Sequence, residues 1–266
     1  MLHKSNSSLK IKTLLLCFTG FLLLTSCKKP EDKNGKAIEL TGTLTQWDQG
    51  AASVNGMGFF VEPHIIGYIN PNGELSIQLP DHFLKMTQDA FAKANSQEGA
   101  PYEMMIPTAR ESFQQTEGLS FQGAEVPLAL AGKYYGFEVL QNDAASTAIF
   151  AASSEAFMQH LLYPSQHQAV EGWLYYFLYA EKPVRLNGTS AVENLFSNDN
   201  EDSYSSSITY QVDIQQGWNI VKYEVKEIVQ SPDAKYNADS KVIISTVDAL
   251  PTGLEWISIS SLNLNL

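Results

Sequence analysis

Apolar and polar residues alternate in short segments from residue 37 onward, and turn residues separate these segments. Ile38–Leu44 alternates in this way, and Glu74–Leu79 does so after the turn Asn70–Gly73. A period of two places successive side chains on opposite faces of a strand, so both segments are predicted as half-buried strands. Gly73 suits the positive φ that a tight hairpin turn needs. The same texture predicts strands at Ser53–Val61 and His64–Ile69.

The pattern after Gly118 is again of the β type for nearly all of the remaining chain. Helical spacing of apolar residues instead predicts one helix within residues 81–97, with Asp81 as its N-cap, and a short helix at Glu155–Leu162. The polar segment 95–116 carries two prolines and is expected to be a linker. The further predicted strands are Leu119–Leu130, Lys133–Leu140, Ala148–Ala152, Gly172–Ala180, Val184–Gly188, Ser207–Ile214, Trp218–Val229 and Val242–Val247.

Short strands, many turns and few helices predict a mainly β fold rather than alternating β and α units. Gly42-Thr43 in the first strand and the Asn72-Gly73 hairpin resemble small domains of the transthyretin and carboxypeptidase-regulatory type. The resemblance implies sandwich-like (transthyretin/Ig-like) lobes. We expect an N-terminal β lobe at 37–80 and a C-terminal β-sandwich at 118–266, with a helix and linker at 81–117 between them.

Two five-residue segments share Leu, Gly and Thr at matching positions, namely Glu39–Thr43 and Arg185–Thr189. Internal repeats are the sequence signature of duplicated structural units. Three identities are compatible with two related lobes, and equally with convergent strand ends.

The first residues have a different pattern. Lys4, Lys10 and Lys12 occur without any acid, and a largely apolar run follows at Thr13–Leu24. This run is too short to remain as a membrane-spanning helix, which needs about 20 apolar residues. A basic segment followed by a short apolar segment is typical of a signal peptide.

The apolar run ends in Leu24-Thr25-Ser26-Cys27, which resembles the lipobox of bacterial lipoproteins. The resemblance implies cleavage before Cys27, a diacylglycerol on its sulfur and an acyl group on its amine. Residues 1–26 are then the signal peptide, and 27–36 form a polar, flexible tether. Several acyl chains hold a protein on a membrane that it does not span. The alternative is a conventional secretory leader with a chance cysteine.

Net charge and cysteine content limit the classes of partner that we expect and the ways in which the fold can be stabilised. Removal of residues 1–26 deletes three lysines and no acid, so the net charge changes from −12 to −15. Such an acidic surface repels phosphate backbones, and nucleic acid is therefore not an expected partner. Cys17 is lost with the signal peptide, which leaves Cys27 alone in the mature chain. Stability must come from a buried core, because no disulfide is available.

Aromatic residues are concentrated in the predicted strand Gly172–Ala180. Alternation places four rings on one face and Leu174, Tyr176 and Leu178 on the other. Two apolar faces favour a buried central strand over an exposed ligand platform. The four rings are those of Trp173, Tyr175, Phe177 and Tyr179. The candidates for a carbohydrate-binding surface are Trp173, Trp218 and Trp256.

The order of three further motifs resembles a pattern in uncharacterised secreted bacterial β proteins. The motifs are Tyr179-Ala180, Gly188-Thr189 and Gly217-Trp218-Asn219. This resemblance covers most of the mature chain and implies a fold without implying a function.

The mature chain shows no motif for nucleophilic catalysis, phosphate binding or dinucleotide binding. Its histidines, which are His64, His82, His160 and His167, lack metal-ligand spacing and are expected at the surface or in local hydrogen bonds. The acidic segment Asn198–Asp202 lacks the order of an EF-hand loop and is expected to be solvated. We therefore expect no cofactor and no metal.

These observations favour a non-enzymatic, lipid-anchored protein of the bacterial cell envelope, in the outer membrane. We expect it to bind a ligand or partner, such as a glycan or an envelope protein, or to serve as a structural or accessory module. Which leaflet it occupies and its oligomeric state are left open. The alternatives are an envelope glycan hydrolase, which needs only two carboxylates brought together by the fold, and a carbohydrate-binding lipoprotein.

Overall fold

Strands dominate the part of the chain that the computed structural model describes, which comprises residues 37–56, 63–97, 103–133, 136–142, 144–196, 203–232 and 237–260. The mainly β class predicted from the sequence is confirmed. The strands are β1 (Ile38–Leu44), β2 (Ala52–Asn55), β3 (Ile65–Ile69), β4 (Glu74–Leu79), β5 (Ser120–Gln122), β6 (Leu128–Ala131), β7 (Phe137–Gln141), β8 (Ala144–Ala152), β9 (Gly172–Ala180), β10 (Val184–Leu195), β11 (Ser203–Ile214), β12 (Gly217–Gln230), β13 (Asn237–Val247) and β14 (Glu255–Ser260). The helices are α1 (Phe83–Asn95), α2 (Ala109–Ser112) and α3 (Glu155–Leu162).

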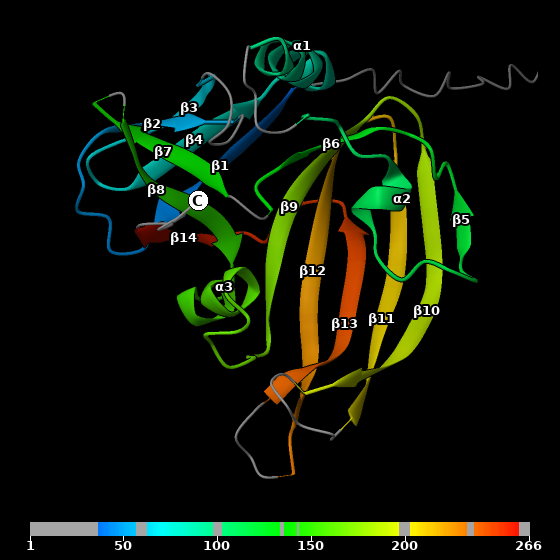
Figure 1. Ribbon diagram of the computed structural model, residues 1–266. Coiled ribbons are helices and arrows are strands. Elements are labelled where there is room, and N and C mark those ends of the chain that lie inside the picture. The colour runs from blue at the N-terminus through cyan, green and yellow to red at the C-terminus, as the bar shows by residue number, and fades with distance from the viewer. Residues whose placement is uncertain are drawn as a thin grey trace, which may run out of the picture. The chain divides into compact units, whose positions relative to one another are not determined.

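Seven strands of the described part close into a barrel (Figure 1). Their order is β14-β1-β4-β3-β2-β7-β8, and a pairing of β14 with β8 completes the circle. β14 runs parallel to β1, with Glu255 opposite Thr43, and antiparallel to β8, with Ile257 opposite Phe150. A closed barrel leaves no free strand edge. Its apolar core contains Trp256, whose side chain is fully buried.

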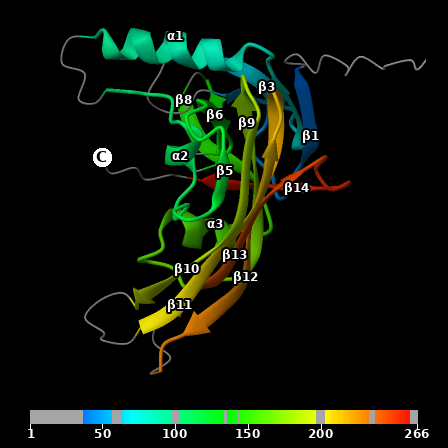
Figure 2. The same ribbon diagram turned by 90° about the vertical axis from the view of Figure 1, so that its right-hand side faces the viewer.

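β9 begins a second sheet, in which the strand order is β9-β12-β13-β11-β10-β5. Neighbouring strands are antiparallel except β11 and β13, which are parallel. Two strands share the other edge of β9, since Tyr175 lies opposite Ala151 of β8 and Phe177 lies opposite Ala131 of β6. Figure 2 shows the long strands curving around the side that carries α2 and α3.

β9 separates two apolar cores. Tyr175 and Phe177 belong to the core of the barrel, whereas Leu174, Tyr176 and Leu178 belong to the core that the second sheet forms with α2 and α3. All five side chains are buried. The prediction of a central strand with two apolar faces is therefore confirmed.

The predicted arrangement of two sandwich-like lobes is not confirmed. Residues 37–80 supply β1 to β4, and residues 118–266 supply the three remaining barrel strands, β7, β8 and β14. The four N-terminal strands have two free edges, at β1 and β2, and each edge pairs with a strand far along the chain. Closing the barrel satisfies the hydrogen bonds of both edges, so this segment needs no second sheet of its own.

Two helices were correctly predicted from the sequence. α1 falls within residues 81–97, and α3 has the predicted bounds. The predicted N-cap of α1 is wrong: His82 occupies the cap position, and the Asp81 carboxylate instead contacts the His82 ring at 2.9 Å. α2 lies in the segment that was expected to be a linker.

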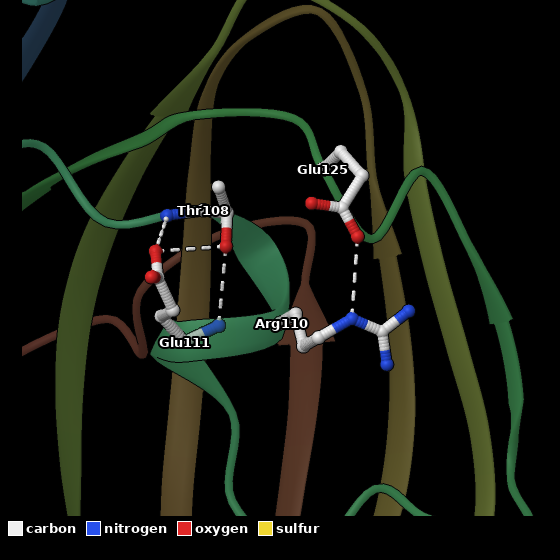
Figure 3. A network of polar contacts seen from close by, with 4 residues as sticks. All are labelled: Thr108, Arg110, Glu111 and Glu125. Atoms are coloured by element: carbon white, nitrogen blue, oxygen red, sulfur yellow. Dashed lines mark hydrogen bonds and ion pairs between the residues drawn. The ribbon is translucent and has the colours of Figure 1, made fainter.

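The short helix α2 is fixed at its start by a capping box (Figure 3). Thr108 Oγ1 accepts a hydrogen bond from the Glu111 N–H at 3.3 Å, and the Glu111 carboxylate accepts one from the Thr108 N–H at 2.7 Å. The backbone N–H and the hydroxyl of Thr108 lower the pKa of Glu111, because both hydrogen bonds favour the ionised carboxylate. Arg110 pairs with Glu125 at 3.2 Å. The capping box therefore fixes the start of α2, and the ion pair joins α2 to the segment that follows β5.

Gly42 of β1 leaves room for Trp256 inside the barrel. A Cβ atom at position 42 would overlap Cδ1 and Nε1 of the Trp256 indole. Gly188, at the matching position of the other Leu-x-Gly-Thr segment, has a φ of 132° on the edge strand β10. The two glycines therefore meet different requirements, and the shared residues do not indicate a structural repeat.

We expect Gly42→Ala to lower the free energy of unfolding by about 1 to 3 kcal/mol, because the added methyl overpacks the barrel. Urea denaturation measures the loss. Thr41→Ala, on the exposed side of the same strand, serves as control and should change stability by about 0.5 kcal/mol or less. Trp256→Phe should cost less in the Gly42→Ala background than alone, since the two positions are in contact. Additive effects would contradict the proposed overlap.

Candidate functional site

A cavity of ≈ 550 Å³ lies on the face of the second sheet that carries α2 and α3. β11, β12 and β13 form its floor, α3 forms one wall, and the segment after α2 and the end of β10 also contribute. Single residues come from β9 and from the segments after β6 and α3. Most of the lining is apolar. The lining residues are Ser112, Phe113, Gln114, Lys133, Met158, His160, Leu161, Leu162, Pro164, Leu174, Leu195, Phe196, Tyr204, Ile208, Tyr210, Tyr223, Asn237, Ala238, Asp239 and Ile244.

Aromatic rings form two ordered pairs in this lining. Phe113 and Tyr210 meet edge to face with their centroids 5.8 Å apart. Phe196 and Tyr204 are tilted by 35° with their centroids 4.7 Å apart. Rings arranged in such pairs are held in place by their neighbours. The cavity therefore has ordered walls against which an apolar molecule can pack.

One corner of the cavity is polar. His160 of α3 and Asp239 of β13 form an ion pair, with Nε2 and Oδ1 3.1 Å apart and both side chains largely buried. Burial raises the pKa of the Tyr204 phenol, and the negative charge of Asp239 raises it further. Tyr204 thus stays a neutral hydroxyl that can donate or accept a hydrogen bond.

The pKa of His160 is raised above its ordinary value of 6.5. Burial is the largest single influence and lowers this pKa, because it disfavours the charged ring. The hydrogen bond to Asp239, the charge of Asp239 and the nearby backbone of His167 act in the opposite direction and together prevail. The ion pair therefore connects α3 to β13 most strongly when His160 is protonated.

A second contact fixes the same region. The Asn237 side chain at the start of β13 accepts a hydrogen bond from the Ala169 N–H at 2.7 Å and donates one to the Ala169 carbonyl at 2.8 Å. Both backbone groups of Ala169, in the segment after α3, are thereby bound to the sheet. Asn237 and His160 hold this wall of the cavity at two points.

Charged side chains are few in the lining of the cavity. Among the lining residues, Asp239 is the one acid, and its Oδ1 already pairs with His160. His160 pairs with Asp239 through Nε2, and no hydroxyl or thiol nucleophile lies within hydrogen-bonding distance of its ring in the described part of the chain. Across those same residues, no group of three or more His, Cys, Asp or Glu side chains is placed to hold a metal ion.

The three tryptophans named from the sequence do not come together. Trp256 is fully buried inside the barrel, where a ligand does not reach it. Trp218 packs against Phe83 of α1, with the ring centroids 4.8 Å apart. Trp218 lies opposite Tyr179 of β9. Tyr179 is six residues from Trp173 on the same strand, so the two ends of this stretch are about 20 Å apart. They therefore form no continuous aromatic row.

Sequence reasoning missed the residues that matter most here. His160 was expected at the surface or in local hydrogen bonds, and that expectation is wrong: it is buried beside Asp239, 79 residues further along the chain. Tyr204 was given no role. The alternation of Ile208, Tyr210 and Val212 does indicate one buried face of a strand, but it carries no signal for an unfilled space above that face.

Cys27 and the acidic segment 198–202 lie outside the described residues. Within the described part, no helix combines the length and apolar character required to cross a membrane. Comparison with protein-family models, curated proteins and solved structures found no match for this chain.

We expect Asp239→Asn to reduce stability in a pH-dependent way. The raised pKa of His160 means that the ion pair stabilises the fold fully below pH 6.5 and loses this effect as the pH rises through the raised pKa. The variant should lose about 1 to 3 kcal/mol below pH 6.5 and less at pH 9. Urea denaturation at both pH values measures the difference.

Asp213→Asn is the matched control, because Asp213 makes an exposed ion pair with Arg185 on the outer side of the sheet. Its loss should be small at both pH values. An equal loss for Asp239→Asn at low and high pH would show that the charge of His160 does not stabilise this wall.

Proposed function

We propose that the protein is a non-enzymatic, lipid-anchored module of the cell envelope that binds a small amphipathic molecule. The observation that carries the proposal is the cavity of ≈ 550 Å³ on the second sheet. Its volume lies within the range of roughly 300 to 1,000 Å³ that is common for small-molecule sites. Such sites combine mainly apolar walls with a few polar groups, as this one does.

The polar corner indicates which kind of molecule fits. In the described part of the chain, the Tyr204 hydroxyl and the second carboxylate oxygen of Asp239 make no hydrogen bond to another residue. A ligand with an apolar body and a hydrogen-bond donor, such as an amine or hydroxyl, satisfies both groups. Burying either group without a partner would cost free energy, so a purely apolar ligand is less suitable.

Anchoring is a separate part of the proposal and rests on the sequence. Lys4, Lys10 and Lys12, the apolar run and the Leu24–Cys27 motif support a lipid on Cys27. A binding module held at a membrane surface meets amphipathic molecules at high local concentration. The net charge of −15 after processing supports a small ligand or envelope partner over nucleic acid.

The cavity is tested by filling it. Ile208→Trp places a large ring inside the cavity, whereas Gln211→Trp on the same strand points to the exposed outer face. The probe is N-phenyl-1-naphthylamine, an apolar dye with one N–H donor whose emission rises in apolar surroundings. We expect the unmodified protein and Gln211→Trp to bind it equally, and Ile208→Trp at least about tenfold more weakly.

Circular dichroism establishes that both tryptophan variants are folded before binding is compared. If Ile208→Trp is folded and binds the dye as tightly as the control variant does, the cavity is not the binding site.

The anchor is tested by metabolic labelling with radioactive palmitate. We expect Cys27→Ala to lose the label and to remain unprocessed, because the thiol is the atom that carries the lipid. Cys17→Ala is the matched control, since Cys17 lies in the segment that is removed. Label that persists in Cys27→Ala, or is lost in Cys17→Ala, contradicts the lipobox assignment.

A further inference from the structure

The outer edge of β10 is open over most of its length. β10 pairs with β11 from Val184 to Leu195, but on its other side β5 pairs only with Arg185–Asn187. Within the described residues, no other strand pairs with that side, as the right-hand border of the sheet in Figure 1 shows. The backbone N–H and C=O groups along one side of Thr189–Leu195 are therefore available to another strand.

This open edge lacks the features that normally prevent pairing. Natural edge strands are short, are interrupted by proline or a bulge, or carry lysine. Thr189–Leu195 contains neither proline nor lysine and carries one charge, at Glu193. Its ladder with β11 is continuous. Seven residues of extended chain offer an edge of about 23 Å.

We infer that this edge is an interface between two copies of the chain, which pair their β10 strands antiparallel about a two-fold axis through Val192. β5 sets the register: a shift that extends pairing toward Asn187 collides with β5, and a shift in the other direction leaves part of the edge unpaired. The register centred on Val192 uses the whole open segment, Thr189–Leu195.

The side chains are self-complementary in this register. Ala191 of each copy lies opposite Glu193 of the other, so no charge faces a like charge directly. Ser190 lies opposite Asn194, and Thr189 lies opposite Leu195. Leu195 is 66% exposed in the single chain, which places it among the most exposed large apolar side chains of the described residues. Directly opposed pairs on neighbouring strands are the units that stabilise a sheet.

A second copy fits this edge better than an unrelated strand does. Pairing about a two-fold axis covers Thr189–Leu195 of both copies with one contact, so this contact does not extend to further copies. An unrelated strand that covers this edge presents a new edge of its own. The contact of two edges is small, and the expected dimer is correspondingly weak.

Cysteine cross-linking in membranes tests the pairing with the full chain. Val192→Cys puts two thiols directly across the two-fold axis, and a short bismaleimide should join them into a dimer. The unmodified chain controls for cross-links through Cys17 or Cys27. Gln211→Cys controls for random collision, because Gln211 is exposed on the inner strand β11. Both controls should give little cross-linked product, because neither has a thiol at the contact between the two β10 strands.

Charge variants then test the register. In the Val192→Cys background, Ala191→Glu places like charges opposite each other at two symmetry-related positions, and Ala191→Lys places opposite charges there. We expect about three- to thirty-fold weaker dimerisation for the first and a comparable strengthening for the second. Position 191 is exposed in the single chain, so both variants retain the fold.

Three outcomes would overturn the inference. The first is a Val192→Cys chain that cross-links no more than the Gln211→Cys control. The second is a cross-linked dimer whose yield is the same for Ala191→Glu and Ala191→Lys. The third is a cross-link from the thiol introduced at position 192 to a different envelope protein in place of a second copy.

Discussion

Burial of β9 on both faces is the constraint on which both halves of the structure depend. Tyr175 and Phe177 fill the barrel, and Leu174 and Tyr176 fill the space between the second sheet and its covering helices. Each such side chain contributes about 1.5 to 3 kcal/mol by leaving water. The two cores therefore share one wall. The backbone of β9 is also shared, because β12 pairs along one edge while β8 and β6 divide the other.

The cavity lies where α3 is attached to this framework. At the cavity, α3 and the segment after it are joined to β13 by polar bridges, from His160 to Asp239 and from Asn237 to Ala169. Phe157 of the same helix packs into the apolar core instead. The polar corner of the cavity therefore lies where these bridges join α3 and the following segment to the sheet.

Local periodicity explains which elements the sequence predicts well. β1, β4, β9 and α3 have the predicted bounds because their patterns are regular and their ends carry turn or capping residues. β14 was not predicted, although Ile257–Ser260 alternates apolar and polar residues as a strand does. The barrel depends on β14, and its pairing with β1 joins positions separated by about 210 residues, as the contact of Thr45 with Glu255 illustrates. No local signal encodes such a pairing.

The candidate site is less predictable than the fold for the same reason. Tyr204, His160 and Asp239 come from three separate elements, and each residue is ordinary within its own segment. The sequence indicates that their strands have a buried face, but burial alone does not distinguish a filled core from a cavity. The depth of the site depends on the spacing between elements, which is set only when β9, β12 and β13 have assembled.

The barrel and the second sheet differ in how their edge strands are paired, and the open border of the second sheet lies next to the cavity. The barrel satisfies every edge by closing on itself. The second sheet joins the barrel at β9, and among the described residues its far border along β10 and β5 is not paired with a further strand. Leu195 lies in that border segment and also lines the cavity. A strand that pairs with β10 therefore lies beside a residue at the rim of the cavity.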